Sequence, residues 1–131
     1  MPNGPYEDRP NWAALFRRKK AESWMSDYSG VVVLAEQPGV RWWVNVWRNE
    51  DKAEVFLSLA VKEKTDQKTK PYKCDLRHVR GGHHYGGELL LGDAVYKIRV
   101  FRAPTRDRAI YLQCQFELIA SPALAGQERG K

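Results

Sequence analysis

Four side chains of the types that bind zinc lie within eleven residues of the sequence: Cys74, His78, His83 and His84. Structural zinc sites are typically built from paired ligands, such as two cysteines separated by two residues. This segment holds one cysteine, and the pairs Gly81-Gly82 and Gly86-Gly87 predict a flexible loop rather than a rigid cage. The four residues are therefore a zinc candidate without the usual pairing, and we predict neither a metal nor a cofactor.

Motifs for covalent catalysis or nucleotide hydrolysis do not occur in the sequence. It lacks a G-x-S-x-G elbow, a G-x-x-x-x-G-K-[ST] loop and a G-x-G-x-x-G turn. Carboxylates in the expected strands stand singly, at Glu88 and Glu117, so they do not form a two-metal set. We predict that the protein is not an enzyme.

Aromatic, amide and basic side chains alternate in two stretches that have the period of a β-strand. The set is Arg41, Trp43, Asn45, Trp47 and Phe56 in the first stretch, with Lys97, Arg99, Phe101, Tyr111 and Gln113 in the second. Flat rings on a sheet provide stacking surfaces worth ~1–3 kcal/mol per base. Lys and Arg can contact phosphates, and amides can pair with base edges. The pattern is typical of single-stranded nucleic-acid binding, as in OB-folds and sheet-type RNA readers.

The elements that carry these residues occur twice in the sequence. Strands are expected at 31–34, 42–48 and 55–61, and again at 88–91, 96–102 and 110–116, because each is rich in β-branched and aromatic residues. Equivalent residues are 57 apart for Tyr28 and Tyr85 and 54 apart for Arg48 and Arg102. Short turns between the strands favour antiparallel meanders.

These elements predict a mostly β fold made of two tandem three-stranded meanders. The six strands would close into a barrel, of which the OB type is one form, or pack as a two-layer sandwich. Alternate residues form the expected core, and Cys114 takes the place of Leu59 as a buried, inert thiol.

The expected domain covers residues 28–118, with repeat one at 28–62, a basic and Gly-rich linker at 63–84 and repeat two at 85–118. An N-terminal arm at 1–27 precedes it, and a flexible tail at 119–131 follows it. Within the arm we expect a short helix or turn over 11–25, with Asn11 as its N-cap and Trp12, Leu15 and Phe16 facing the core.

Charge and composition favour a polyanionic partner. The 131 residues carry 22 Lys+Arg against 16 Asp+Glu, a formal net charge of +6. Basic support for an anion site comes from a cluster at Arg17, Arg18, Lys19 and Lys20. No secretory signal and no apolar run of membrane-spanning length are present, so we expect a cytoplasmic protein without a membrane partner.

Four stretches in the first half of the chain form a recognisable set: N-W-A-A-L-F-R-R-K-K at 11–20, D-Y-S-G at 27–30, W-V-N-V-W at 43–47 and F-L-S-L-A-V-K-E-K at 56–64. With these stretches the first half of the chain resembles a group of small uncharacterised proteins of phages, prophages and plasmids. The matching stretches cover about half the chain and depart from the group at Ala13, where it tends to have Gly. The resemblance implies a mobile-element origin and a role in DNA metabolism or host takeover, and it supplies no catalytic residues.

The sequence therefore predicts a non-catalytic, sequence-tolerant binder of single-stranded nucleic acid, DNA in the first instance, encoded by a phage or mobile element. The alternative is an interaction module that binds a host or defence protein, or a second copy of itself, through the same aromatic and basic face. A third reading has the N-terminal arm covering that face.

Overall fold

The computed structural model describes residues 9–17, 19, 22–51, 54–65, 68–102 and 110–121, and of residues 110 and 111 the backbone alone. Every regular element in this part of the chain is a strand, and no helix there is long and apolar enough to cross a membrane. The predicted features at 1–8, Arg18, Lys20 and 122–131 lie outside the described residues. The strands are β1 (Trp12–Arg17), β2 (Tyr28–Val33), β3 (Arg41–Asp51), β4 (Glu54–Glu63), β5 (Tyr72–His78), β6 (His84–Leu91), β7 (Ala94–Arg102) and β8 (Ile110–Ala120).

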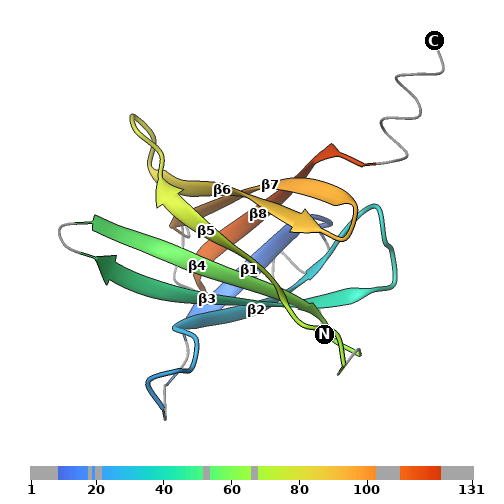
Figure 1. The fold of residues 1–131 in the computed structure, drawn as a ribbon, viewed down its shortest axis with the longest axis horizontal. Helices are drawn as coiled ribbons and strands as arrows, with labels where there is room; N and C mark the ends of the chain where they lie inside the picture. Colours follow the sequence, from blue (N-terminus) through green and yellow to red (C-terminus); the bar gives the residue numbers. More distant parts are fainter. Residues whose placement is uncertain are drawn as a thin grey trace.

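The eight strands form a closed antiparallel barrel in sequence order, in which β8 returns to pair with β1 (Figure 1). The predicted mostly β fold is confirmed, whereas the predicted number of six strands is wrong. Closure through β1 and β8 leaves no sheet edge within the described strands, which removes the usual route to edge-to-edge association.

Two seams of the barrel are short. Strands β1 and β2 share two residue pairs, and so do β5 and β6, whereas β3 and β4 share ten. The barrel is thus built from one sheet of β2–β3–β4–β5 and a second of β6–β7–β8–β1, joined at both short seams. Figure 1 shows β7 and β8 on the side of the molecule away from β2 and β3.

The repeat includes one more strand per copy than the sequence predicted. Register pairs Tyr28 with Val46 and Leu59 with Cys74 in one half. In the other half it pairs Tyr85 with Val100, and Cys114 with Ala13. Strand β5 is therefore the equivalent of β1, so each copy is a four-stranded meander.

Residues 12–17 form strand β1, so the predicted N-terminal helix is wrong. The apolar positions 12, 15 and 16 fit one side of a helix, but they also fit a strand with apolar residues on both faces. Ala13 and Leu15 point inward and are fully buried, while Phe16 is exposed on the outside. Tertiary pairing decides the outcome, because the barrel closes only if this segment joins β8 to β2.

Asn11 fixes the start of β1 rather than capping a helix. Its φ angle is +69°, a conformation that Asn tolerates better than most residues. Its side-chain amide donates to the carbonyl of Phe116 (2.9 Å), and its side-chain oxygen accepts from the N–H of Ala35 (2.6 Å). Asn11 therefore ties β8 to the turn that follows β2.

Strand β5 lies within the segment predicted to be a basic linker. Tyr72, Cys74 and Leu76 face inward, while Lys73, Asp75 and Arg77 face solvent, as the alternating burial shows. The sequence of β5 alternates in the same way, but the lysines that precede it indicate a linker, so the strand was not predicted. The predicted tail also begins too early, because β8 continues to Ala120.

The barrel interior is filled with side chains, as expected for eight strands. The predicted core is confirmed along β3, β4, β7 and β8, where inward side chains alternate with outward ones. The largest fully buried members are Tyr96, Phe116, Leu15, Leu34, Leu59, Leu76, Leu89 and Ile98. Each large apolar side chain contributes roughly 1.5–3 kcal/mol when fully buried. The hydroxyl of Tyr96 donates to a Glu36 carboxylate oxygen (2.8 Å), which satisfies its one buried donor.

Candidate nucleic-acid interface

The residues predicted to form one binding face are placed on two different sides of the barrel. Arg41, Trp43, Asn45, Trp47 and Phe56 lie on the outside of β3 and β4, in the first sheet. Lys97, Arg99, Phe101 and Gln113 lie on the outside of β7 and β8, in the second sheet. Barrel closure separates the two groups, so they do not make a single surface. The side chain of Tyr111 lies outside the described residues.

The β7–β8 side is packed and its charges are balanced. Phe101 lies between His84 (5.1 Å between ring centroids) and Trp12 (6.2 Å). Arg99 donates to a carboxylate oxygen of Glu117 (2.8 Å) and to the Gln115 amide oxygen (3.3 Å). The ring of Phe101 is thus partly covered by strand β1, as one reading of the sequence expected.

Lys97 on this side has acidic neighbours on both adjacent strands. In register it stands opposite Glu88 on β6 and opposite Glu117 on β8. Carboxylates at both positions repel phosphate, and their negative charges offset the positive potential of the lysine that was expected to attract it. This side therefore offers a poor surface for a polyanion.

The segment before β2 covers part of the β3–β4 side. The hydroxyl of Ser26 donates to the side-chain oxygen of Asn45 (2.9 Å), and the indole N–H of Trp47 donates to the carbonyl of Trp24 (2.9 Å). The Asp27 carboxylate accepts from the backbone N–H of Arg48 (2.7 Å). These bonds engage the polar atoms of Asn45 and Trp47, but the ring of Trp47 still lines an open groove.

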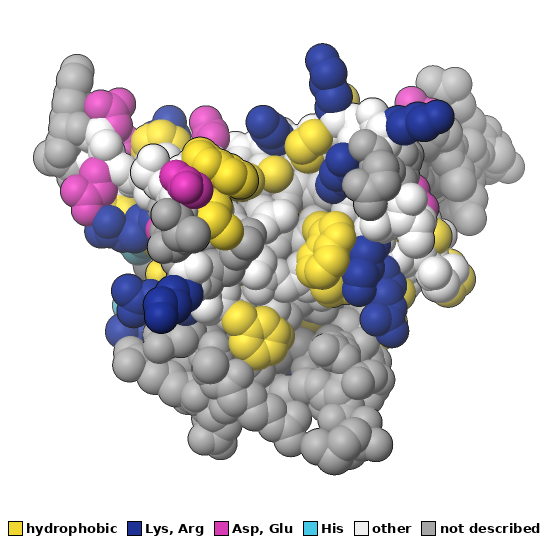
Figure 2. All heavy atoms as spheres, turned by 90° about the horizontal axis from the view of Figure 1, so that it is seen from below, with side chains coloured by type: hydrophobic (Ala, Val, Ile, Leu, Met, Phe, Trp, Pro, Cys, Tyr) yellow, Lys and Arg dark blue, Asp and Glu magenta, His cyan; other side chains and the backbone are white. Residues whose placement is uncertain are grey.

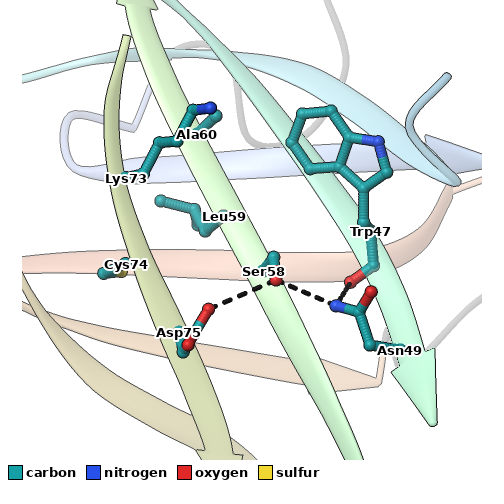
Figure 3. Close-up of a pocket in the computed structure, with 8 residues that line it drawn as sticks. All are labelled: Trp47, Asn49, Ser58, Leu59, Ala60, Lys73, Cys74 and Asp75. Carbon is teal, nitrogen blue, oxygen red and sulfur yellow. Dashed lines mark hydrogen bonds between the residues drawn. The ribbon is translucent and has the colours of Figure 1, made fainter. Parts of the chain in front are cut away.

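This groove, of about 530 Å³, runs over the outside of β3, β4 and β5 (Figure 3). It exists because β4 presents the small side chains of Ser58 and Ala60 between larger neighbours. Trp47 stands on the β3 side, and Lys73 and Asp75 stand on the β5 side. A flat ring on one wall and a cation on the other suit a nucleotide, whose base stacks while its phosphate needs a positive charge.

A chain of polar contacts crosses the groove. The Asn49 amide donates to the Ser58 hydroxyl (2.8 Å) and to the Trp47 carbonyl (3.4 Å), and the Ser58 hydroxyl donates to an Asp75 carboxylate oxygen (3.2 Å). These bonds are drawn as dashed lines in Figure 3. Asp75 is unfavourable for a phosphate at this point, but its oxygens can accept from the amino group of a base.

Trp43 is exposed on the outside of β3, at the end of the strand where Arg41, Lys62 and Lys64 lie. Its side chain is 39% exposed, and the Lys64 ammonium lies 4.7 Å from its ring centroid. Lys62 is the cross-strand partner of Trp43, and Arg41 is exposed two residues earlier on the same strand. The backbone N–H of Lys64 donates to the Arg41 carbonyl (2.8 Å), which holds these cations beside the ring. Figure 2, seen from below the view of Figure 1, shows exposed hydrophobic side chains between groups of Lys and Arg.

At the other end of this side, Phe56 is covered. The Arg77 guanidinium lies 4.7 Å from its ring centroid and pairs with Glu54 (3.0 Å). Phe56 is also less exposed than Trp43, and because the cation over its ring is paired with Glu54, this end attracts a phosphate less than the end with Trp43 does. Of the predicted set, the residues best placed to contact a nucleic acid are therefore Arg41, Trp43 and Trp47.

Of the predicted basic cluster, the described members do not lie beside Trp43. Arg17 ends β1 and stands opposite Tyr28 in register, which places it at the rim of the barrel. Lys19 is exposed beyond β1. The sequence missed Lys73, Asp75 and Asn49 as groove residues, and the alternation of β5 was the signal that could have found the first two.

The predicted zinc candidates do not come together. In the part of the chain that the structure describes, no group of three or more His, Cys, Asp or Glu side chains could hold a metal ion. Burial, and then the charge of Asp75, raises the pKa of Cys74 to about 12, so its thiol stays protonated. Burial likewise raises the pKa of Cys114, which fits its place in the core.

Comparison of the chain with protein-family models, with curated proteins and with solved structures finds no match. The function is therefore inferred from the geometry of the chain itself.

Proposed function

We propose that the protein is a non-catalytic binder of single-stranded nucleic acid that uses the outside of β3, β4 and β5. The observation that carries the proposal is the exposed Trp43 ring among Arg41, Lys62 and Lys64, beside a groove walled by Trp47 and Lys73. A single strand needs stacking surfaces and cations along one line of the protein surface, and the outside of β3, β4 and β5 provides both.

The spacing of the two rings fits an extended ligand. Trp43 and Trp47 are four residues apart on the outside of one strand, a separation of roughly 13 Å at about 3.3 Å per residue. Asn45 lies between them with its side-chain oxygen bonded to Ser26. We propose that bases stack on each tryptophan while the phosphates pass Lys62, Lys64 and Lys73.

Tolerance of different base sequences follows from the chemistry of this proposed binding surface. Stacking on indole and attraction to lysine accept any base, because every base has a flat face and every nucleotide a phosphate. The Asn49–Ser58–Asp75 chain can add a modest preference through base amino groups. We propose DNA as the first ligand to test, in line with the mobile-element resemblance of the first half of the chain.

The test is a fluorescence titration of the purified protein with a labelled single-stranded oligonucleotide and with its duplex, at two salt concentrations. We expect preference for the single strand and an affinity that falls with salt, by ~0.7 in log–log slope for each phosphate contacted. Trp43→Ala should weaken binding, with Phe16→Ala as its control. Phe16 is 36% exposed on the outside of β1, in the other sheet, and does not line the groove.

Absence of binding at low salt would refute the proposal and favour the alternative, a module for protein partners. Equal loss of affinity in Trp43→Ala and Phe16→Ala would show that the assigned binding surface is wrong. Equal affinity for single strand and duplex would remove the stacking role of the tryptophans, because paired bases are not free to stack on them.

A further inference from the structure

A second cavity opens at the end of the barrel where β2, β4, β6 and β8 begin and where β3 and β7 end. It measures about 360 Å³. Its lining residues are Tyr28, Arg48, Val55, Leu57, His83, Tyr85, Val100, Phe101, Arg102 and Leu112. The mouth of a β-barrel is a common place for a small-molecule site, and this volume is at the small end of the usual range. The groove on the outside of β3–β5 shares none of these lining residues.

The two copies of the repeat supply matching residues to this mouth. Arg48 pairs in register with Leu57, and Arg102 pairs with Leu112. Strands β3 and β7 stand four places apart in a ring of eight, so the two arginines come from opposite sides of the barrel. The same holds for the tyrosines on β2 and β6, Tyr28 and Tyr85.

The chemistry of the cavity changes with depth. Its floor is apolar, with Leu57 and Val100 buried and Leu112 partly buried. Its rim carries the exposed arginines Arg48 and Arg102 together with the exposed His83. A ligand that satisfies both parts has a compact apolar body and an anionic head.

The two arginines differ in their partners. Arg48 pairs with Glu50 at 2.6 Å, so its charge is partly neutralised. Arg102 forms no ion pair with an acidic side chain among the residues that the structure describes. Arg102 is therefore the stronger anion contact, and Arg48 the weaker one.

We propose that the barrel mouth binds a small organic anion, with its ring-sized apolar body on the Leu57–Leu112 floor and its carboxylate or phosphate head between Arg102 and Arg48. The arginine fork suits either head, because both carboxylate and phosphate accept two parallel hydrogen bonds. The proposal does not depend on nucleic-acid binding at the outer groove.

The experiment is calorimetric titration of the full chain with three probes that share one ring system: 2-naphthoate, 2-naphthyl phosphate and 2-naphthalenemethanol. We expect at least one anion to bind with one-to-one stoichiometry and the alcohol to bind at least ~10-fold more weakly, since it lacks the charge that the arginines attract. Comparison of the two anions identifies the preferred head.

Variants locate the binding. Arg102→Gln should lower the affinity for the preferred anion roughly 10-fold, and Arg48→Gln should lower it less. Arg9→Gln is the matched control, because Arg9 lies just before β1 at the opposite end of the barrel and should leave anion binding unchanged. Circular dichroism of each variant confirms that the barrel is folded.

Four results would overturn the proposal. One is equal affinity for the anions and the alcohol, and another is unchanged affinity in both Arg102→Gln and Arg48→Gln. The third is loss of binding in Trp43→Ala, which would place the naphthyl ring on the outer surface. Failure of all three probes to bind has the same consequence for this cavity.

Discussion

Tyr28 and Tyr85 occupy equivalent places in the two halves of the barrel: each faces inward at the mouth and pairs in register with a valine, Val46 or Val100. The two four-stranded copies are interleaved. Strand β1 of the first copy joins the sheet of β6–β8, and β5 of the second copy joins the sheet of β2–β4. Each sheet therefore depends on a strand from the other copy, and neither half closes without its partner.

Gly30 and Gly87, two residues after the tyrosines, should be intolerant of a side chain. A Cβ at Gly87 would lie 2.5 Å from the Asp75 carbonyl oxygen, and a Cβ at Gly30 would overlap the Ala14 carbonyl oxygen. Backbone cannot move aside as a flexible side chain does, so we expect Gly30→Ala and Gly87→Ala each to lower the free energy of unfolding by ~1–3 kcal/mol. Chemical denaturation measures this.

Gly86→Ala is the control on the same strand. A Cβ there would lie 3.1 Å from the Val79 Cγ2 atom, and Val79 is itself exposed and able to shift. We expect a smaller loss of stability than at Gly87. Equal losses at Gly86 and Gly87 would show that close backbone approach at the seam is not the cause.

Asn11 should stabilise the barrel through both its side-chain bonds and its backbone conformation. Asn11→Gly keeps the positive φ accessible but removes the bonds to Phe116 and Ala35, whereas Asn11→Ala removes both advantages. We expect thermal denaturation to rank the stabilities as wild type, then Gly, then Ala, with about 1 kcal/mol for each lost neutral hydrogen bond. If Ala were as stable as Gly, the backbone conformation would carry no cost.

The sequence predicted the strands whose faces differ in polarity and missed those whose local signal was ambiguous. Strand β3 alternates strongly, as in Val44 and Val46 against Trp43 and Asn45, and was found. Strand β1 has apolar residues on both faces: Ala13 and Leu15 point inward, and Ala14 is buried on the outer face. A short apolar run of this kind also fits a helix. Strand β5 follows a lysine-rich stretch, which obscured its alternation.

The candidate site was predicted in part because alternation assigns a side chain to the inside or the outside but not to a side of the barrel. Trp43 and Phe101 have the same local pattern, yet closure places them on different sheets. The groove itself depends on the neighbour relation of Ser58 on β4 to Asp75 on β5. Pairing between strands that are distant in sequence decides such features, and local periodicity does not encode it.

Alkaline pH should destabilise the protein through buried acids. Burial raises the pKa of Cys74 to about 12 and raises those of Cys114 and Tyr96, the last also through its bond to Glu36. The folded state therefore keeps protons that the unfolded state loses, so the stabilisation is present below the unfolded pKa, ~8.5 for Cys, and is lost as the pH rises toward the folded pKa. Each group adds a slope of at most ~1.4 kcal/mol per pH unit.

Denaturation with urea between pH 8 and pH 11 measures this slope. The double variant Cys74→Ala/Cys114→Ala removes two of the three groups, so its stability should fall less steeply with pH, even if it is lower at neutral pH. The same slope in the variant and the wild type would show that the two thiols do not cause the alkaline loss.

Lys64→Ala should weaken oligonucleotide binding more than Lys97→Ala does, although each substitution removes one positive charge. Lys64 lies over Trp43, whereas Lys97 stands between Glu88 and Glu117. We expect Lys64→Ala to reduce the slope of log affinity against log salt by ~0.7, the value for one phosphate contact to a single strand, and Lys97→Ala to leave it unchanged. Equal slopes in the two variants would place the bound strand elsewhere.

Asp75→Asn should strengthen binding of a single strand. Asp75 accepts from Ser58 in the middle of the groove, where its charge repels a passing phosphate, and Asn keeps an oxygen that can accept the same bond. We therefore expect several-fold higher affinity at low salt and a smaller gain at high salt, because screening weakens the repulsion that the substitution removes. Glu117→Gln, on the β7–β8 side, removes the same charge away from the groove and is the matched control. A comparable gain in both variants would mean that net charge alone governs affinity, and an unchanged Asp75→Asn would mean that the strand does not cross the groove between Trp47 and β5.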